Sequence, residues 1–305
     1  MQYTEIKISI NTEDTERAGN IANMVVPYGI YIEDYSELEK EAWEIARIDL
    51  IDEDLLKKDR SKSIIHVYIE EEQNPMEAVS FLRERLESEK ISNTIELNGC
   101  SDEDWRDKWK AYFKPTAVGE RLFIRPVWID DFDAGNRAVL NIEPGAAFGT
   151  GTHDTTRLCL ETLDKVVKTG DTVLDIGCGS GILAISSLLL GANEAFGVDI
   201  DELAVKTARE NGKMNGFNEP KLKFVCGDLA DKVTKQYDVV VANIVADIII
   251  LFSTQVKAFM KRGAKFIASG IIDTRADEVV FALQNAGLTV KERIESDGWV
   301  CLVCE

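Results

Sequence analysis

A strand, a tight turn and the start of a helix are encoded in the stretch Val173-Leu174-Asp175-Ile176-Gly177-Cys178-Gly179-Ser180-Gly181. The apolar residues before Gly177 predict a buried strand over 172–176, and the apolar run from 182 to 190 predicts a helix. Glycines between them let the backbone approach a ligand closely, and the helix N-terminus offers free N–H groups. The next predicted strand ends in Asp199, a carboxylate placed to accept hydrogen bonds from ribose hydroxyls. This order of elements is typical of an α/β fold that holds an adenosine-containing cofactor.

The glycine spacing distinguishes two cofactor classes. A dinucleotide-binding turn has the spacing G-x-G-x-x-G, whereas here Gly177, Gly179 and Gly181 alternate and Ile182 follows. The pattern D-x-G-x-G-x-G, with Asp175 at the strand end, resembles the first motif of methyltransferases that use S-adenosylmethionine (SAM). SAM has no phosphate and carries a sulfonium, an amino group and a carboxylate, so an acid beside the turn suits it better than it suits NAD. A dehydrogenase is the least favoured enzyme class, and the structural alternative is a βαβ turn without a ligand.

Composition and charge limit the partners. The chain has 305 residues and a formal net charge of −19, of which residues 1–100 contribute −12 (23 acidic residues against 11 Lys or Arg). An acidic surface repels nucleic acid and attracts a basic protein, although solubility alone is the other reading of such charge. We therefore expect a basic partner and no direct nucleic-acid binding. The N-terminus lacks signal-peptide character and no apolar run would span a bilayer, which predicts a cytoplasmic protein with no membrane association.

The cysteines do not predict a metal site. Without a secretory signal, the six cysteines are expected to be reduced. Cys301 and Cys304 match C-x-x-C, but they lie in a predicted strand, where residues three apart face opposite sides. No second pair accompanies them and the chain has only two histidines, so we expect no metal there.

Residues 1–98 alternate between strand and helix patterns. Strands are predicted at 3–10, 30–32, 64–69 and 94–97, and helices at 12–26 and 75–86. The order β-α-β-β-α-β predicts a ferredoxin-like α+β domain. The acid-rich stretch from Glu33 to Asp59, with a predicted helix at 38–48, is the expected insertion between its halves.

The rest of the chain predicts a linker and a second domain. Residues 99–139 combine an aromatic helix ended by Pro115 with a strand at 123–128. Residues 140–305 alternate strands and helices, which predicts a mostly parallel sheet. Its expected strands are 172–176, 195–199, 222–226, 237–242, 265–269, 289–293 and 299–303. We therefore expect a seven-stranded Rossmann-like SAM methyltransferase domain, with the last two strands as an antiparallel hairpin.

Before this sheet, the chain carries the string Phe148-Gly149-Thr150-Gly151-Thr152-His153-Asp154-Thr155-Thr156. By its glycines and hydroxyls the loop 143–156 is either a lid, with Phe148 shielding a cofactor from water, or an ordinary connector. This string, the glycine motif and Asn243-Ile244-Val245-Ala246 together resemble the bacterial methyltransferases that modify large-subunit ribosomal protein L11 (the PrmA family). The aromatic linker and Gly119-Glu120-Arg121-Leu122 match as well, so the resemblance covers essentially the whole chain.

The resemblance implies a substrate-recognition domain (1–98), a linker (99–139) and a SAM-dependent domain (140–305). It implies methylation of lysine side chains and of the N-terminal α-amine of L11. The residues that it places at the cofactor are Thr156, Gly177, Gly179, Asp199, Asp228 and Asn243. For Asp228, expected near the adenine amine, a solvated acid at a strand end is the alternative reading.

Asn243 is the residue expected to orient the substrate. Many amino methyltransferases use an N-P-P-Y loop, and here the sequence is Asn-Ile-Val-Ala. A less rigid loop would suit several target amines; the alternative is an Asn that caps the next helix. A lysine ammonium, with a reference pKa of ~10.4, must lose a proton before it can attack. Because His153 is expected to make a structural hydrogen bond, we expect water to take that proton.

Three other functions stay open at this point. The catalytic domain could act on a small molecule or on RNA, and poor RNA binding at physiological salt would disfavour the latter. A non-catalytic SAM-binding interaction protein is the third, and the intact glycine motif and Asn243 count against it.

Overall fold

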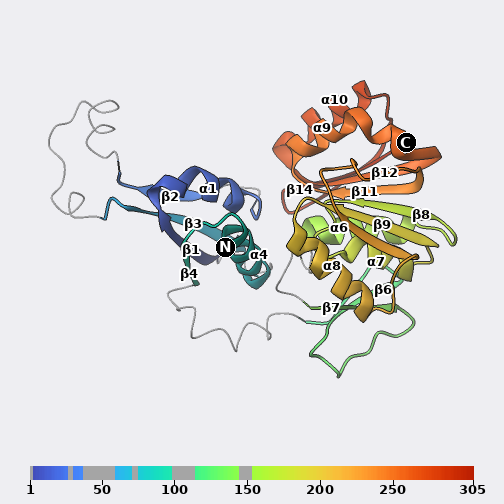
Figure 1. The fold of residues 1–305 in the computed structure, drawn as a ribbon, viewed down its shortest axis with the longest axis horizontal. Helices are drawn as coiled ribbons and strands as arrows, with labels where there is room; N and C mark the ends of the chain where they lie inside the picture. The colour runs from blue at the N-terminus through green and yellow to red at the C-terminus, as the bar shows by residue number, and fades with distance from the viewer. Residues whose placement is uncertain (1–2, 27–29, 37–58, 71–74, 98–113, 144–152) are drawn as a thin grey trace. The chain divides into compact units, whose positions relative to one another are not determined.

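The computed structural model describes residues 3–26, 30–36, 59–70, 75–97, 114–143 and 153–305. The chain divides into two compact units, residues 1–112 and 113–305 (Figure 1). The helix expected at 38–48, the aromatic helix before Pro115 and residues 144–152 of the loop lie outside the described residues. No helix in the described ranges is long and apolar enough to cross a membrane.

The first unit contains a four-stranded antiparallel sheet with the strand order β2-β3-β1-β4. Its elements are β1 (Tyr3–Asn11), η1 (Thr12–Asp14), α1 (Thr15–Asn23), β2 (Tyr31–Asp34), β3 (Lys62–Glu70), α4 (Pro75–Ser88) and β4 (Asn93–Leu97). One sheet face buries Ile6, Ile8 and Ile65. The helix expected at 12–26 begins as a 3-10 turn and ends at Asn23. The Thr15 hydroxyl donates to the Thr12 carbonyl at 2.8 Å, a local bond that competes with a regular helix start.

The segment expected to be a linker and a single strand forms a small sheet in the second unit. Its strands are β5 (Thr116–Val118), β6 (Leu122–Pro126) and β7 (Ala138–Ile142), in that order. Val118, Leu122 and Leu140 are buried in the same core as the helices of the large sheet. Only β6 was expected, because β5 is three residues long and β7 lies across the predicted boundary at 139/140.

The large sheet of the second unit has the strand order β10-β9-β8-β11-β12-β14-β13. Its strands are β8 (Thr172–Ile176), β9 (Glu194–Asp199), β10 (Leu222–Cys226), β11 (Tyr237–Asn243), β12 (Met260–Ile272), β13 (Val290–Ser296) and β14 (Trp299–Cys304). Neighbours from β10 to β12 are parallel, and β14 is antiparallel to both β12 and β13. The mixed α/β sheet with a terminal hairpin was predicted. Strand β12 is longer than predicted, because Lys261, Arg262 and Gly263 interrupt its apolar pattern.

Helices cover both faces of this sheet (Figure 1). One core contains residues of α6 (Asp154–Val166), α7 (Ile182–Leu189) and α8 (Glu202–Met214), together with the small sheet. The other contains residues of α9 (Ala246–Val256) and α10 (Ala276–Asn285), next to the 3-10 turns η4 (Lys257–Phe259) and η5 (Asp273–Arg275). Strand β8 comes first in sequence among the strands of this sheet and lies between β9 and β11. The order in which the chain adds strands therefore changes from one side of β8 to the other, although the strands remain parallel. The carboxyl ends of strands at such a point are where open α/β sheets bind ligands.

Candidate functional site

The sheet register brings three predicted site residues into one row. Ile176 of β8 pairs with Val198 of β9 and with Ala242 of β11. The next residues along these parallel strands are Gly177, Asp199 and Asn243, so they lie side by side at the carboxyl edge. Strand β8 therefore supplies the turn of one site, and its neighbours β9 and β11 supply the acid and the amide.

The glycine turn has backbone angles that favour glycine at each alternating position. Gly177, Gly179 and Gly181 have φ values of 69°, 50° and 78°. A Cβ on Gly177 would lie 2.4 Å from Ile244 Cγ2, and one on Gly181 would lie 2.6 Å from Phe224 Cζ. The turn is therefore held between the loop that follows β11 and strand β10, and a side chain at either glycine would be both strained and crowded.

The expectation of free N–H groups behind the glycine turn was wrong for the amides of Gly179, Ile182 and Ala184. Gly179 N donates to Asp199 Oδ2 at 2.8 Å, and Ala184 N donates to Asp175 Oδ2 at 3.1 Å. Ile182 N lies 3.4 Å from Ser180 Oγ. The two acids of the motif thus satisfy the amides that would otherwise bind a phosphate. A turn with its amides occupied by carboxylates suits a ligand without phosphate.

Asp175 is completely buried beneath the turn. Its Oδ1 has no hydrogen-bond partner among the described residues. Burial, and to a smaller extent the charge of Asp199, raise the pKa of Asp175 to about 7, against the lowering effect of the Ala184 N–H. The sequence marked Asp175 as a ligand-side acid, whereas the structure uses one of its oxygens to cap α7.

Asn243 contacts a second predicted residue that is 87 positions away in the chain. Its Nδ2 donates to Thr156 Oγ1 at 3.3 Å, and Thr156 is completely buried near the start of α6. Asn243 Oδ1 is buried and has no partner among the described residues. Helix α9 begins after Val245 without a side-chain cap, so the alternative that Asn243 caps this helix was wrong. The amide is held on its nitrogen side and its carbonyl oxygen is left available.

His153 has the structural hydrogen bond that was predicted for it. It is the N-cap of α6, where its Nδ1 accepts from Thr155 N at 3.3 Å and lies 2.9 Å from Thr155 Oγ1. Its ring also packs edge-on against Trp299, with the ring centroids 5.3 Å apart. His153 therefore fixes the helix turn that carries Thr156.

Asn211 of α8 is a site-supporting residue that the sequence analysis missed. It is buried, and its Nδ2 donates to the Ser180 carbonyl at 2.9 Å, which ties α8 to the glycine turn. Its Oδ1 lies 3.5 Å from Glu143 N, at the start of the glycine-rich loop. The available signal was an amide between Ala208 and Gly212, in the segment between the predicted strands 195–199 and 222–226.

The remaining predicted positions differ in their surroundings. Asp228 follows β10 and is exposed, and the described residues provide no hydrogen bond to its side chain; its role at the adenine stays a prediction. Cys301 and Cys304 are buried in the cores on opposite faces of the sheet, as strand geometry predicts. In the described part of the chain, no three His, Cys, Asp or Glu side chains are grouped to hold a metal.

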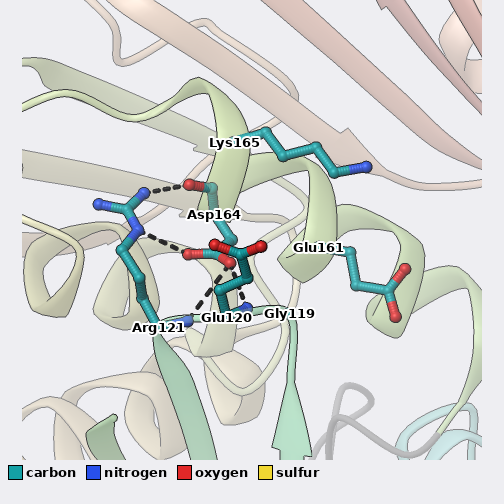
Figure 2. Close-up of a pocket in the computed structure, with 6 residues that line it drawn as sticks. All are labelled: Gly119, Glu120, Arg121, Glu161, Asp164 and Lys165. Carbon is teal, nitrogen blue, oxygen red and sulfur yellow. Dashed lines mark hydrogen bonds and ion pairs between the residues drawn. The ribbon is translucent and has the colours of Figure 1, made fainter. Parts of the chain in front are cut away.

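A separate pocket of about 310 Å³ lies where the β5–β6 turn meets α6 (Figure 2). Its centre is an ion pair in which Arg121 Nε donates to Asp164 Oδ1 at 2.7 Å. Arg121 also donates to the Asp164 and Leu190 carbonyls, which lie at the ends of α6 and α7. Glu120 N donates to Asp164 Oδ2 at 2.6 Å. These contacts fasten the turn to the two helix C-termini, and the pocket is a structural joint away from the glycine turn.

Comparisons with known proteins agree with this geometry. The sequence matches the family described as Ribosomal protein L11 methyltransferase (PrmA) over residues 2–305. It is 35% identical over 309 residues to a ribosomal protein L11 methyltransferase of Clostridium perfringens, covering 99% of this chain and 98% of that protein. A relative of the same name from Acetivibrio thermocellus is 36% identical over 308 residues, with the same coverage of both chains. The crystal structure of a ribosomal protein L11 methylase from Lactobacillus delbrueckii subsp. bulgaricus superposes with a TM-score of 0.60 at 27% identity, covering 63% of this chain and 98% of that one. The chain belongs to the ribosomal protein L11 methyltransferase (PrmA) family.

Proposed function

We propose that this chain transfers methyl groups from SAM to lysine side chains and to the N-terminal α-amine of ribosomal protein L11. Family membership over residues 2–305 supports the reaction class. The observation that supports the site is the carbonyl oxygen of Asn243, which is buried and unpartnered in the described structure, beside the glycine turn. A buried acceptor without a donor is costly unless a ligand supplies one.

The described residues fit SAM. Gly177 and Gly179 present backbone at the sheet edge, and Thr156 anchors the loop side of the site. Asp199 accepts hydrogen bonds from the Gly179 and Asp201 amides at 2.8 and 3.0 Å, which orient its carboxylate at the sheet edge where the ribose hydroxyls are proposed to bind. Bound SAM supplies a methyl group on a sulfonium that is already a good leaving group. Asp228 at the adenine end is part of the same proposal.

The work left to the protein is alignment of a neutral amine. Asn243 Oδ1 accepts an N–H of the incoming amine and directs its lone pair, and positioning of this kind is worth roughly 7–11 kcal/mol in the best cases. The buried setting of the site and the sulfonium charge both favour the uncharged amine. Because His153 Nδ1 is engaged in capping α6, the proton leaves to water.

The first unit is proposed to be a ferredoxin-like recognition domain. Its antiparallel strand order β2-β3-β1-β4, with a helix after β1 and after β3, supports that fold. Residues 1–100 carry −12 of the formal net charge of −19, which favours encounter with a basic protein and disfavours RNA. Of residues 99–139, the part before β5 is then the proposed connection between recognition and catalysis, because β5 to β7 belong to the second unit. A ribosomal-protein substrate also fits a cytoplasmic location.

The test is methyl transfer from labelled SAM to a mixture of purified bacterial ribosomal proteins, read by intact mass. One protein gaining methyl masses, identified as L11, is the expected result. Asn243→Ala should bind SAM normally and lose about 100-fold in turnover, because misplaced reactants lose rate on that scale. Asn285→Ala, at the exposed end of α10, is the matched control and should behave like the wild type. A chain that binds SAM and labels no protein would favour a small-molecule substrate or a binding role.

A further inference from the structure

The sheet of the first unit has two different faces. Its isoleucine-rich face forms the core with α1 and α4. On the opposite face, the pairing register aligns one residue from each strand in a single row. In the order β2-β3-β1-β4 the row is Tyr31, His66, Lys7 and Glu96. Glu5 and Tyr68, paired with each other, and Glu33, two residues beyond Tyr31, lie on this same face. We call these seven residues the open face.

A histidine fixes two carboxylates on the open face. His66 Nδ1 lies 2.8 Å from Glu5 Oε1, and His66 Nε2 lies 3.3 Å from Glu33 Oε1. The second contact is close enough for an ion pair but lacks hydrogen-bond geometry, so His66 Nε2 has no hydrogen-bond partner among the described residues. Tyr68 OH donates to Glu5 Oε1 at 3.1 Å. His66 is only 5% exposed although it points away from the core, so its neighbours hold the ring in place.

Glu5 is a charged group at neutral pH. The hydrogen bond from His66 is the main cause that holds the pKa of Glu5 below its usual range, against the effect of burial. Counted formally, the three glutamates and Lys7 give the open face a net charge of −2 (three negative, one positive), which becomes −1 when His66 carries the proton that an ion pair with Glu33 requires. A fixed negative charge binds a cation at a lower entropic cost than a mobile one, because less side-chain freedom is lost.

The exposed ring of Tyr31 stands beside this charge. Tyr31 is 54% exposed, and its ring centroid lies 5.3 Å from that of His66. An aromatic ring that is open to solvent and bordered by oriented carboxylates matches a cationic side chain, which the ring face and the carboxylates both attract. We infer that the open face binds a lysine or arginine side chain on the surface of the basic protein substrate. The inference rests on the proposed function and names the surface on which its substrate docks.

The alternative to a basic protein is single-stranded nucleic acid, which in other proteins binds to aromatic residues on a sheet face. Its phosphates would meet Glu5, Glu33 and Glu96, with Lys7 as the single cation of the face. Neutralisation of phosphates drives such binding, and this face offers the opposite charge. The observations therefore favour a cationic protein.

The test uses the full-length chain and purified L11, with direct binding of labelled L11 measured beside methyl transfer. Tyr31→Ala and Glu33→Gln should each raise the Kd and the KM for L11 about twofold to fivefold, which is the range of an exposed cation–π or charged contact. Their kcat, KM for SAM and thermal unfolding midpoint should stay at wild-type values. Tyr31→Phe keeps the ring and should restore binding. Glu16→Gln, on exposed α1 away from the open face, is the charge-matched control and should not change binding.

Each contrary result has a distinct meaning. Wild-type Kd for Tyr31→Ala would overturn the inference, and so would absence of L11 binding by the wild-type chain. Equal weakening by Glu33→Gln and Glu16→Gln would also overturn it, because general charge would then suffice. Binding of a single-stranded RNA oligomer that is lost in Tyr31→Ala would assign the face to nucleic acid instead. A wild-type chain that binds L11 through Tyr31 and transfers no methyl group would refute the proposed function and leave the docking surface supported.

Discussion

Asp175→Asn is expected to change how the stability of the second unit depends on pH. The folded pKa of Asp175, about 7, is higher than the value near ~3.9 of an unfolded chain. Below both values the group is protonated in both states and contributes nothing. As pH rises between them, the unfolded chain ionises first, so the free energy of unfolding falls. The three-unit difference amounts to about 4 kcal/mol in total at ~1.36 kcal/mol per unit.

About half of this loss, ~2 kcal/mol, falls between pH 5.5 and 8.5, a window above the isoelectric point of about 4.6. The introduced amide is a neutral isostere that still offers an oxygen to Ala184 N, so the variant should lack this slope. The measurement is urea unfolding of both proteins without SAM across the window, followed by a probe within the second unit. The quantity compared is the difference in unfolding free energy between variant and wild type, in which other titrating groups cancel.

Asp238→Asn is the control of opposite sign. Asp238 is partly buried, which raises its pKa, but bonds from Lys261 and Thr172 outweigh this and leave the pKa lowered. Its folded pKa is below the unfolded value, so it stabilises the fold above that value and loses this effect as pH falls. The Asn variant should therefore be less stable than wild type at neutral pH. A difference for Asp175→Asn that stays constant from pH 5.5 to 8.5 would refute the assignment of a raised pKa to this residue.

Three further outcomes are expected. Gly177→Ala should weaken SAM binding by calorimetry and destabilise the fold by about 1–3 kcal/mol, whereas Gly135→Ala, with positive φ but no atom within 4 Å of an added Cβ, should show only the cost of the backbone angle. Arg121→Lys removes the planar fork that bonds Asp164 and should cost about 1.5–3 kcal/mol in denaturant unfolding, with no change in KM for SAM if the pocket is only a structural joint. His153→Ala should lower the melting temperature while keeping the shape of the kcat–pH profile; loss of a steep break in that profile would instead identify His153 as the base.

Local patterns predicted the elements that build the site. The glycine spacing of the turn, the alternation of strands and helices, and the acid at the end of β9 depend on residues close in sequence, and their positions were right to within a few residues. The family resemblance carried by the loop string, the turn and Asn243 is confirmed by the match over residues 2–305. Strands β5 and β7 were missed because short strands have too few residues for a periodic signal.

The sequence by itself determined the fold class, the family and the residues that lie at the carboxyl edge of the sheet, because periodicity and turn chemistry are local. Only the tertiary structure decided how those residues are used. It paired the Ala184 amide of α7 with Asp175 and the Gly179 amide of the turn with Asp199, joined Asn243 to Thr156, and placed His66 between Glu5 and Glu33. These contacts depend on strand register and burial, which are set by pairing between segments tens of residues apart. Burial also decides which polar atoms are left without partners, and at Asn243 it leaves the oxygen that we propose binds the substrate amine.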